Sequence, residues 1–130
     1  MIQIRTLDQS TAGMRIEGPS LSLPSAVVTI RELITFRVQN EVERYNWEKP
    51  EKYYGLVQPT DVETVLNGPS KRAFKPIQVD KQIEAALQAF EKQRIIVLTP
   101  KGQAESLDDT VSLFDGDEVS FLRLVPLVGG

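Results

Sequence analysis

The sequence contains no cysteine and no histidine. Without cysteine the chain can form no disulfide, has no thiolate nucleophile and offers no cysteine ligand to a metal ion. Without histidine it also lacks the usual general base and the commonest protein metal ligand. The remaining Asp, Glu, Lys, Ser and Tyr residues show no spacing typical of a catalytic site. We therefore expect a protein that is not an enzyme and that has no metal ion or cofactor of its own.

Long apolar runs and clusters of positive charge are also missing. No apolar stretch approaches the roughly 18 residues that span a membrane, and the opening MIQIRTLDQS lacks the charged and apolar regions of a leader peptide. The formal net charge is -3, with Lys and Arg scattered along the chain, so no basic patch is available for a phosphate backbone. These absences predict a cytoplasmic protein that binds neither membranes nor nucleic acid.

The composition is typical of one ordinary globular domain. Of the 130 residues, 41% are hydrophobic and 25% are charged, which is enough for an adequate core. We expect a single domain over residues 1–130, with a helical insert at about 48–93 and a flexible C-terminal tail at 125–130.

The first residues predict a β-hairpin. Ile2 and Ile4 alternate with polar residues, the turn signal DQSTAG follows at 8–13, and Met14 and Ile16 alternate again. We expect the four apolar residues of this hairpin to pack in the core. Four residues from later segments should join them: Leu33, Val38, Phe121 and Leu122.

The next segment predicts a long helix. Thr29 and Glu32 have the spacing of a capping box, and Val28 and Leu33 that of a hydrophobic staple. One apolar stripe at helical spacing should face a sheet, with Glu41 among the polar residues that fall largely elsewhere. The stripe comprises Ile30, Leu33, Ile34, Val38, Val42 and Tyr45.

The insert begins with an irregular, aromatic stretch. We expect Trp47, Tyr53 and Tyr54 to anchor the insert on its own domain rather than to form a docking surface. A short helix is predicted near Thr60 and Glu63, which repeat the capping-box spacing.

A second helix is predicted within the sequence VDKQIEAALQAFEKQ, residues 79–93, with Asp80 as its cap. Its apolar stripe is formed by Ile83, Ala86, Leu87 and Phe90.

The remaining residues predict strands. RIIVLT (94–99) is rich in β-branched residues, a turn at 100–102 follows, and QAESL (103–107) is expected to pair with it. After the turn at Asp115 and Gly116, the last strand has apolar residues on both faces, which predicts an interior place beside the N-terminal strand. The acidic stretch ESLDDTVSLFDGDE is expected to be a solvated loop.

These segments together resemble the ubiquitin-like β-grasp family. MIQIRTL is similar to the opening strand of that family, and the segment from RIIVLT to the terminal Gly-Gly is similar to its closing half. The resemblance covers residues 1–47 and 94–130, and implies an α+β fold with a mixed sheet and one main helix. The insert departs from the pattern. Enlarged relatives of this kind are encoded in bacterial operons beside activating, conjugating and deubiquitinase-like enzymes.

The resemblance also implies a function for the last residues. In the family an activating enzyme uses ATP to adenylate the terminal carboxylate, which here belongs to Gly130. Glycine lacks Cβ, so Gly129 and Gly130 can enter a narrow channel, where Val128, Leu127 and Pro126 would be recognised. The carboxylate would then pass to a target amine as an isopeptide bond, and the conjugating enzyme and the deubiquitinase-like protease would be further partners.

Two alternatives to conjugation are open. The DGDEV turn and the VPLVGG tail are also similar to the sulfur carriers of thiamin and molybdopterin synthesis, which implies a C-terminal thiocarboxylate. A β-grasp scaffold can instead serve as a binding module that self-assembles through its sheet edges. In any of these cases, Leu122, Leu124 and Ile96 are candidates for an exposed apolar patch that contacts partners, unless the added helices cover them.

Overall fold

The structure, a computed structural model, describes residues 1–49, 55–57 and 76–124. Within these ranges the elements follow in the order β1 (Ile2–Ser10), β2 (Arg15–Glu17), β3 (Leu21–Leu23), β4 (Val27–Thr29), α1 (Ile30–Glu48), α3 (Val79–Glu91), β5 (Ile95–Thr99), β6 (Gly102–Gln103), β7 (Thr110–Ser112) and β8 (Glu118–Arg123). Strands therefore occupy both ends of the described chain, and the helices lie between them in sequence.

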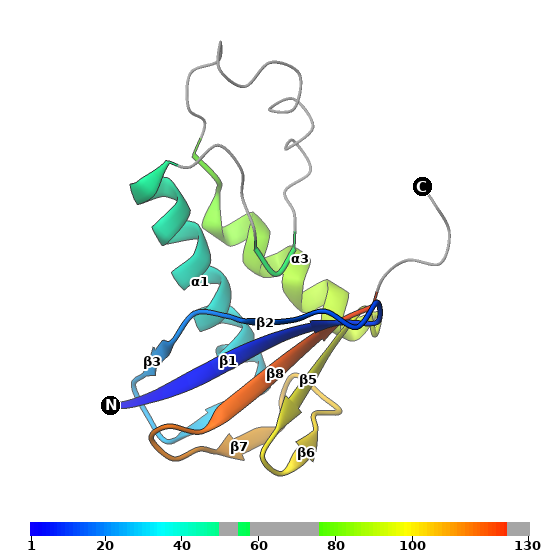
Figure 1. The fold of residues 1–130 in the computed structure, drawn as a ribbon. Helices are drawn as coiled ribbons and strands as arrows, with labels where there is room; N and C mark the ends of the chain where they lie inside the picture. Colours follow the sequence, from blue (N-terminus) through cyan, green and yellow to red (C-terminus); the bar gives the residue numbers. More distant parts are fainter. Residues whose placement is uncertain (50–54, 58–75, 125–130) are drawn as a thin grey trace.

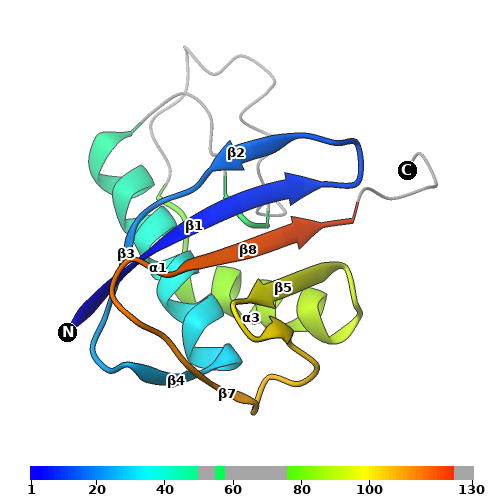
Figure 2. The same cartoon turned by 60° about the horizontal axis from the view of Figure 1, so that its bottom comes forward.

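The main sheet is mixed, with the strand order β2-β1-β8-β5-β6 (Figure 2). Its centre is the parallel pair of β1 and β8, in register from Arg5 opposite Glu118 to Ser10 opposite Arg123. The other pairings of this sheet are antiparallel, including that of β3 with the start of β1. The predicted interior place of the last strand, beside the N-terminal strand, is confirmed.

Helix α1 begins as the sequence predicts. The Thr29 hydroxyl accepts a hydrogen bond from the Glu32 N–H at 3.1 Å, and the Glu32 carboxylate accepts one from the Thr29 N–H at 2.9 Å. All six residues of the expected apolar stripe are buried. The placement of Glu41 on the polar side is wrong: its side chain is buried beside that of Arg37, which compensates its charge.

Helix α3 exists, but its start differs from the prediction. The N-cap is Gln78, without a side-chain capping bond, and Asp80 lies inside the first turn. A carboxylate there still interacts favourably with the positive end of the helix dipole, so an acidic residue near a helix start need not be the cap. Ala86 and Phe90 are buried, while Ile83 and Leu87 are partly buried against the core.

Both helices lie on the same face of the main sheet, and α3 packs along α1 (Figure 1). The side chains that fill this interface come from alternate positions of the strands, such as Ile4, Val97, Val119 and Phe121, each with no exposed surface. The molecule is thus an α+β protein with a β-grasp-like fold.

The hairpin of β1 and β2 is confirmed, but the core positions expected for Met14 and Ile16 are wrong. Their side chains are 59% and 52% exposed. The reason is their place at the margin of the sheet: β2 is a strand of three residues, and β1 is its only neighbouring strand among the residues that the structure describes. Among the other expected core residues, Ile4, Leu33, Val38 and Phe121 are buried, and Ile2 and Leu122 are half-buried.

The insert is held at its described ends by side chains that bond to its backbone. Asn46 exchanges two hydrogen bonds with the backbone of Ile77, and Gln82 donates to the carbonyl of Val57. The expectation that Trp47 anchors the insert is wrong, because its side chain is 86% exposed. The predicted short helix near residues 60–63 and the other two aromatic anchors, Tyr53 and Tyr54, lie outside the described residues.

Candidate functional site

The tail predicted to react lies outside the described residues: Gly130, Gly129, Val128, Leu127 and Pro126. The structure does describe the segment that leads into this tail. Strand β8 ends at Arg123, and the N–H of Leu124 then donates a hydrogen bond of 3.0 Å to the carbonyl of Arg94. The tail therefore follows directly from a central strand that is paired on both sides.

The three residues predicted to contact partners lie together on the sheet face opposite the helices. Ile96 and Leu122 are directly opposite each other in the pairing of β5 with β8. Leu124 lies two positions after Leu122, so it points to the same face, and its side chain is 37% exposed. In the described part of the chain no helix covers this face, so the side chains of the patch are accessible to a partner.

Two further residues extend the patch. Leu7 of β1 and Leu98 of β5 both lie opposite Ser120, and both are half-buried. We call the five residues Leu7, Ile96, Leu98, Leu122 and Leu124 the open-face patch. Strand alternation predicts that Leu7 and Leu98 lie on this face, but only the strand register shows that they lie beside Leu122.

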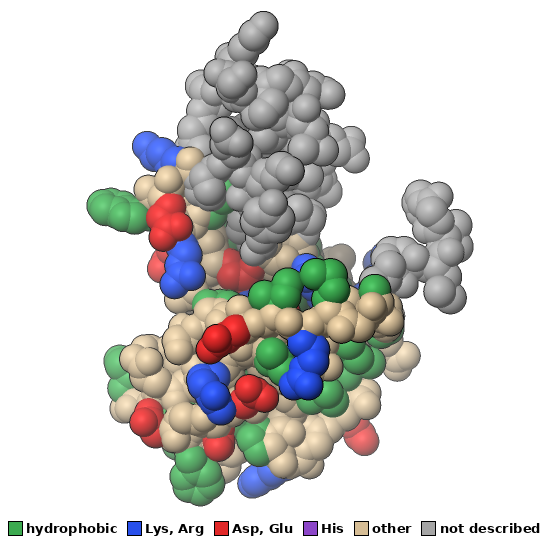
Figure 3. All heavy atoms as spheres, in the orientation of Figure 1, with side chains coloured by type: hydrophobic (Ala, Val, Ile, Leu, Met, Phe, Trp, Pro, Cys, Tyr) green, Lys and Arg blue, Asp and Glu red, His purple; other side chains and the backbone are tan. Residues whose placement is uncertain are grey.

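Charged residues border the open-face patch. Arg5 lies opposite Glu118, while Glu17 and Arg15 of the edge strand lie beside Leu7 and Gln9 of β1. Figure 3 shows the resulting surface, in which apolar side chains gather over the strands with Lys, Arg, Asp and Glu side chains among them. An apolar centre with a charged rim is the usual anatomy of a protein-binding surface.

A buried charge network lies on the other side of the sheet. Two nitrogens of the Arg37 guanidinium donate to the two oxygens of Asp8, each at 2.7 Å, and its Nε donates to Glu41. The guanidinium also lies 4.9 Å from the ring centroid of Phe121. The second oxygen of Glu41 accepts from the N–H of Leu56 at 2.8 Å. The network therefore joins β1, α1, β8 and the insert.

The environment of Glu41 changes its titration. Burial raises the pKa of Glu41 above its ordinary value, and the attraction of Arg37 opposes that rise. Sequence reasoning missed the network, although Arg37 and Glu41 have the i, i+4 spacing of an intrahelical ion pair. Because every polar group of the network has a partner within the protein, its role is structural. Among the described residues, no three acidic side chains are grouped so that they could hold a metal ion.

The DGDEV segment forms a turn that ties β8 to the start of β1. Asp115 accepts a hydrogen bond of 2.8 Å from the N–H of Gln3, and the N–H of Gly116 donates to the carbonyl of Gln3 at 2.7 Å. Asp117 accepts from the N–H of Phe114 at 2.8 Å. Gly116 has φ +89, a conformation that suits glycine. These turn contacts are therefore sufficient to explain why Asp115, Gly116 and Asp117 occur at these positions.

The expectation of a solvated loop for the whole acidic stretch is wrong. It includes β7, which pairs with β4 in a second, two-stranded sheet. One carboxylate oxygen of Asp109 accepts from the N–H groups of Glu105 and Ser106. The acidic residues are thus used in turn formation. The expected partner strand at 103–107 is also shorter than predicted, since only Gly102 and Gln103 pair with β5.

Comparison with known proteins adds no relative. No family model matches the chain, and neither does any curated protein or any solved structure. No helix in the described ranges is long and apolar enough to cross a membrane. The fold, the open-face patch and the residues that follow β8 are therefore the features from which a function can be inferred.

Proposed function

We propose that this protein is a ubiquitin-like modifier, acting in the cytoplasm, whose Gly130 carboxylate is activated and joined to amines of target proteins. The observation that carries the proposal is the place of β8. This strand is central in a β-grasp-like sheet, and the sequence VPLVGG follows it after Leu124. A central strand gives the tail a rigid base, and the two glycines give it an end without side chains.

The chemistry requires help from a partner enzyme. The carboxylate would attack the α-phosphate of ATP, releasing pyrophosphate and forming an acyl-adenylate. An enzyme thiol or the target amine would then displace AMP, and the amine loses a proton as the amide forms. The modifier supplies only the carboxylate and its recognition surfaces, which agrees with a sequence that lacks cysteine and histidine.

The open-face patch supports the same proposal. A modifier must be recognised by an activating enzyme, by a conjugating enzyme and by the protease that releases it. Half-exposed apolar residues such as Leu122 and Ile96, with charges at their border, offer a surface that these partners could share in turn. Leu124 joins this patch to the tail, so an enzyme could contact both at once.

The experiment uses the position of the last basic residue. Arg123 is the last trypsin site of the chain, so trypsin would leave residues 124–130 attached to a modified lysine of the target. We expect peptide mass spectrometry of proteins captured with the tagged chain from its own cells to detect this seven-residue remnant on lysine. A variant lacking Gly129 and Gly130 is the matched control and should give none.

Two outcomes would contradict the proposal. If intact-mass measurement shows that the mature chain does not end at Gly130, the carboxylate assignment is wrong. If Gly130 carries sulfur in place of a carboxylate oxygen and no lysine remnant is found, the protein is a sulfur carrier instead. The variant Leu122→Ser tests the patch separately: we expect it to reduce conjugation without unfolding the protein, because Leu122 is only half-buried.

A further inference from the structure

The outer edge of β5 is only partly paired. Strand β6 pairs with Leu98 and Thr99, and the N–H of Ala104 then donates to the carbonyl of Val97 at 2.9 Å. After Ala104 the chain leaves this edge and crosses to the start of α1, where the Leu107 carbonyl accepts from the N–H of Arg31 at 2.9 Å. Ile95 consequently has a strand neighbour on the β8 side and none on the other side among the described residues.

The backbone of Ile95 points toward this unpaired edge. The N–H of Arg94 donates to the carbonyl of Ala89, but the carbonyl of Arg94 accepts a hydrogen bond from Leu124 and so points toward β8. Because backbone groups alternate along a strand, the N–H and C=O of Ile95 point the opposite way. Unpaired groups at a strand edge can accept a further strand.

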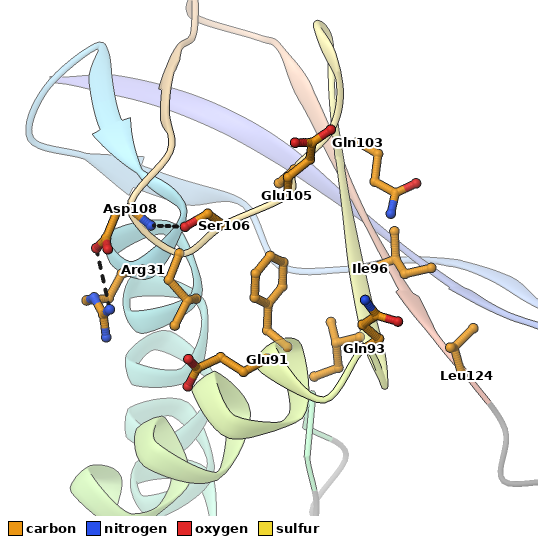
Figure 4. A pocket seen from close by; sticks show the side chains of 13 residues that line it. Arg31, Glu91, Gln93, Ile96, Gln103, Glu105, Ser106, Asp108 and Leu124 are labelled. Atoms are coloured by element: carbon orange, nitrogen blue, oxygen red, sulfur yellow. Dashed lines mark hydrogen bonds and ion pairs between the residues drawn. The ribbon is translucent and has the colours of Figure 1, made fainter.

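A hollow of about 510 Å³ lies along this edge (Figure 4). It is bounded by the C-terminal end of α3, by β5 and by the segment from Gln103 to Asp108. Phe90, Ile95 and Leu107 lie at its base, with only 7%, 3% and 5% of their surfaces exposed. Ile96, near the start of β5, and Leu124, just after the end of β8, lie at one side of the hollow. The site thus combines a free backbone edge with an apolar base.

The rim of the hollow is negative. Three carboxylates, those of Glu91, Glu105 and Asp108, contribute to the lining, and Arg31 is the one cation among the described lining residues. Arg31 is itself 3.5 Å from Asp108. A ligand with positive charge at its ends would therefore be favoured over a neutral or acidic one.

We propose that this hollow binds an extended segment of a partner protein, which adds to β5 as a strand. The segment would exchange backbone hydrogen bonds with Ile95, direct alternate apolar side chains toward Phe90 and Leu107, and place a Lys or Arg near Glu91 or Glu105. Strand addition of this kind derives affinity from the main chain and selectivity from the side-chain pockets. The site differs from the open-face patch in using the sheet edge, and it does not require the terminal glycines.

The test uses a synthetic probe, the capped peptide Lys-Val-Thr-Val-Thr-Val-Lys, with the full chain labelled for NMR. We expect the peptide to shift the amide signals of Ile95 and Val97 and to slow hydrogen exchange at Ile95. The same peptide N-methylated at its central valine cannot form all the backbone bonds and should shift neither signal. Unchanged binding of the methylated peptide would contradict strand addition.

Charge reversal tests the rim. The double variant Glu91→Lys and Glu105→Lys should bind the lysine-ended peptide about tenfold more weakly, since two favourable charge contacts become repulsive. It should in turn bind a glutamate-ended peptide better than the wild type does. The control is Glu43→Lys and Glu48→Lys, which changes the net charge equally at exposed helix positions outside the hollow and should bind normally.

The remaining outcomes also decide the proposal. If no peptide affects the amide signal of Ile95, the partner-segment proposal is overturned. It is also overturned if the amide signals of this edge shift with protein concentration alone, because the occupant would then be another copy of the chain. A variant lacking Gly129 and Gly130 should bind the peptide as the full chain does. Failure of conjugation and failure of strand addition can therefore be distinguished.

Discussion

Replacing Arg37 by methionine should destabilise the protein strongly. The side chain of Arg37 is 2% exposed, and those of Asp8 and Glu41 are 17% and 7% exposed. Methionine keeps most of the aliphatic stem but removes the cation, which leaves two carboxylates in the interior without a counter-charge. Breaking a buried ion pair by removing one partner costs about 3–5 kcal/mol. Because water can reach Asp8 more easily than Glu41, we expect a loss of about 3 kcal/mol, the lower end of that range.

The matched control is Arg31→Met. Arg31 is also on α1 and also pairs with an aspartate, Asp108, but at 3.5 Å and with side chains 49% and 85% exposed. Exposed pairs of this type contribute about 0–1 kcal/mol. The same substitution at the two positions therefore separates the loss of a buried charge from the loss of an arginine on this helix.

Urea unfolding followed by far-ultraviolet circular dichroism measures the effect. With a denaturant slope of about 1–3 kcal/mol per molar, the midpoint of Arg37→Met should fall by at least about 1 M. Adding Asp8→Asn and Glu41→Gln to this variant removes both unpaired charges and should restore part of the stability. If Arg37→Met costs no more than Arg31→Met, or if the triple variant is less stable than the single one, the reasoning is refuted.

Three further predictions concern individual residues. Thr29→Ala removes the side chain that caps α1 and should lower the free energy of unfolding by about 1 kcal/mol in the same assay, whereas no change would show that the cap is dispensable. Since burial raises the pKa of Glu41, the folded protein binds a proton there before the unfolded chain does, and this contribution to stability falls as the pH rises through the folded pKa. When the pH is lowered from about 7 to about 5, the free energy of unfolding of the wild type should therefore rise relative to that of Glu41→Gln. A fall of the wild type relative to the variant would mean that the attraction of Arg37 dominates the titration of Glu41. Trp47, the only tryptophan, is 86% exposed, so its fluorescence maximum should change little on unfolding; a large red shift would contradict that exposure.

The sequence was most informative where a local rule fixes the structure. The Thr29 and Glu32 pair defines the start of α1 because both capping bonds form within four residues. The central place of β8 was predictable because apolar residues occur on both of its faces, which requires a neighbour on each side and cover on the face of Phe121.

Features that depend on distant contacts were missed. Strands β3, β4 and β7 have three residues each, too few for an alternating pattern to be recognised. Glu41 is polar in sequence and buried in the protein because Arg37 and the backbone of Leu56 satisfy its oxygens. Met14 and Ile16 alternate correctly for a strand, but alternation does not reveal that the strand lies at an edge.

The same limits apply to the candidate sites. Ile96, Leu122 and Leu124 could be named from the sequence because they are apolar residues on the second face of predicted strands. Leu7 and Leu98 needed the register opposite Ser120. The hollow beside Ile95 was not predicted, since it arises from the early end of β6 and from the route of the following loop to α1.

The pairing of β1 with β8 has a consequence for synthesis of the protein on the ribosome. Arg5 pairs with Glu118, so the middle of the sheet cannot close until almost the whole described chain has been translated. A nascent chain that stops before Glu118 would lack one strand of the central pair and would leave Thr6 and Val97, the partners of Val119 and Phe121, without their neighbour. Cellular proteases would remove such products, so only chains translated through the last strand would persist as folded protein.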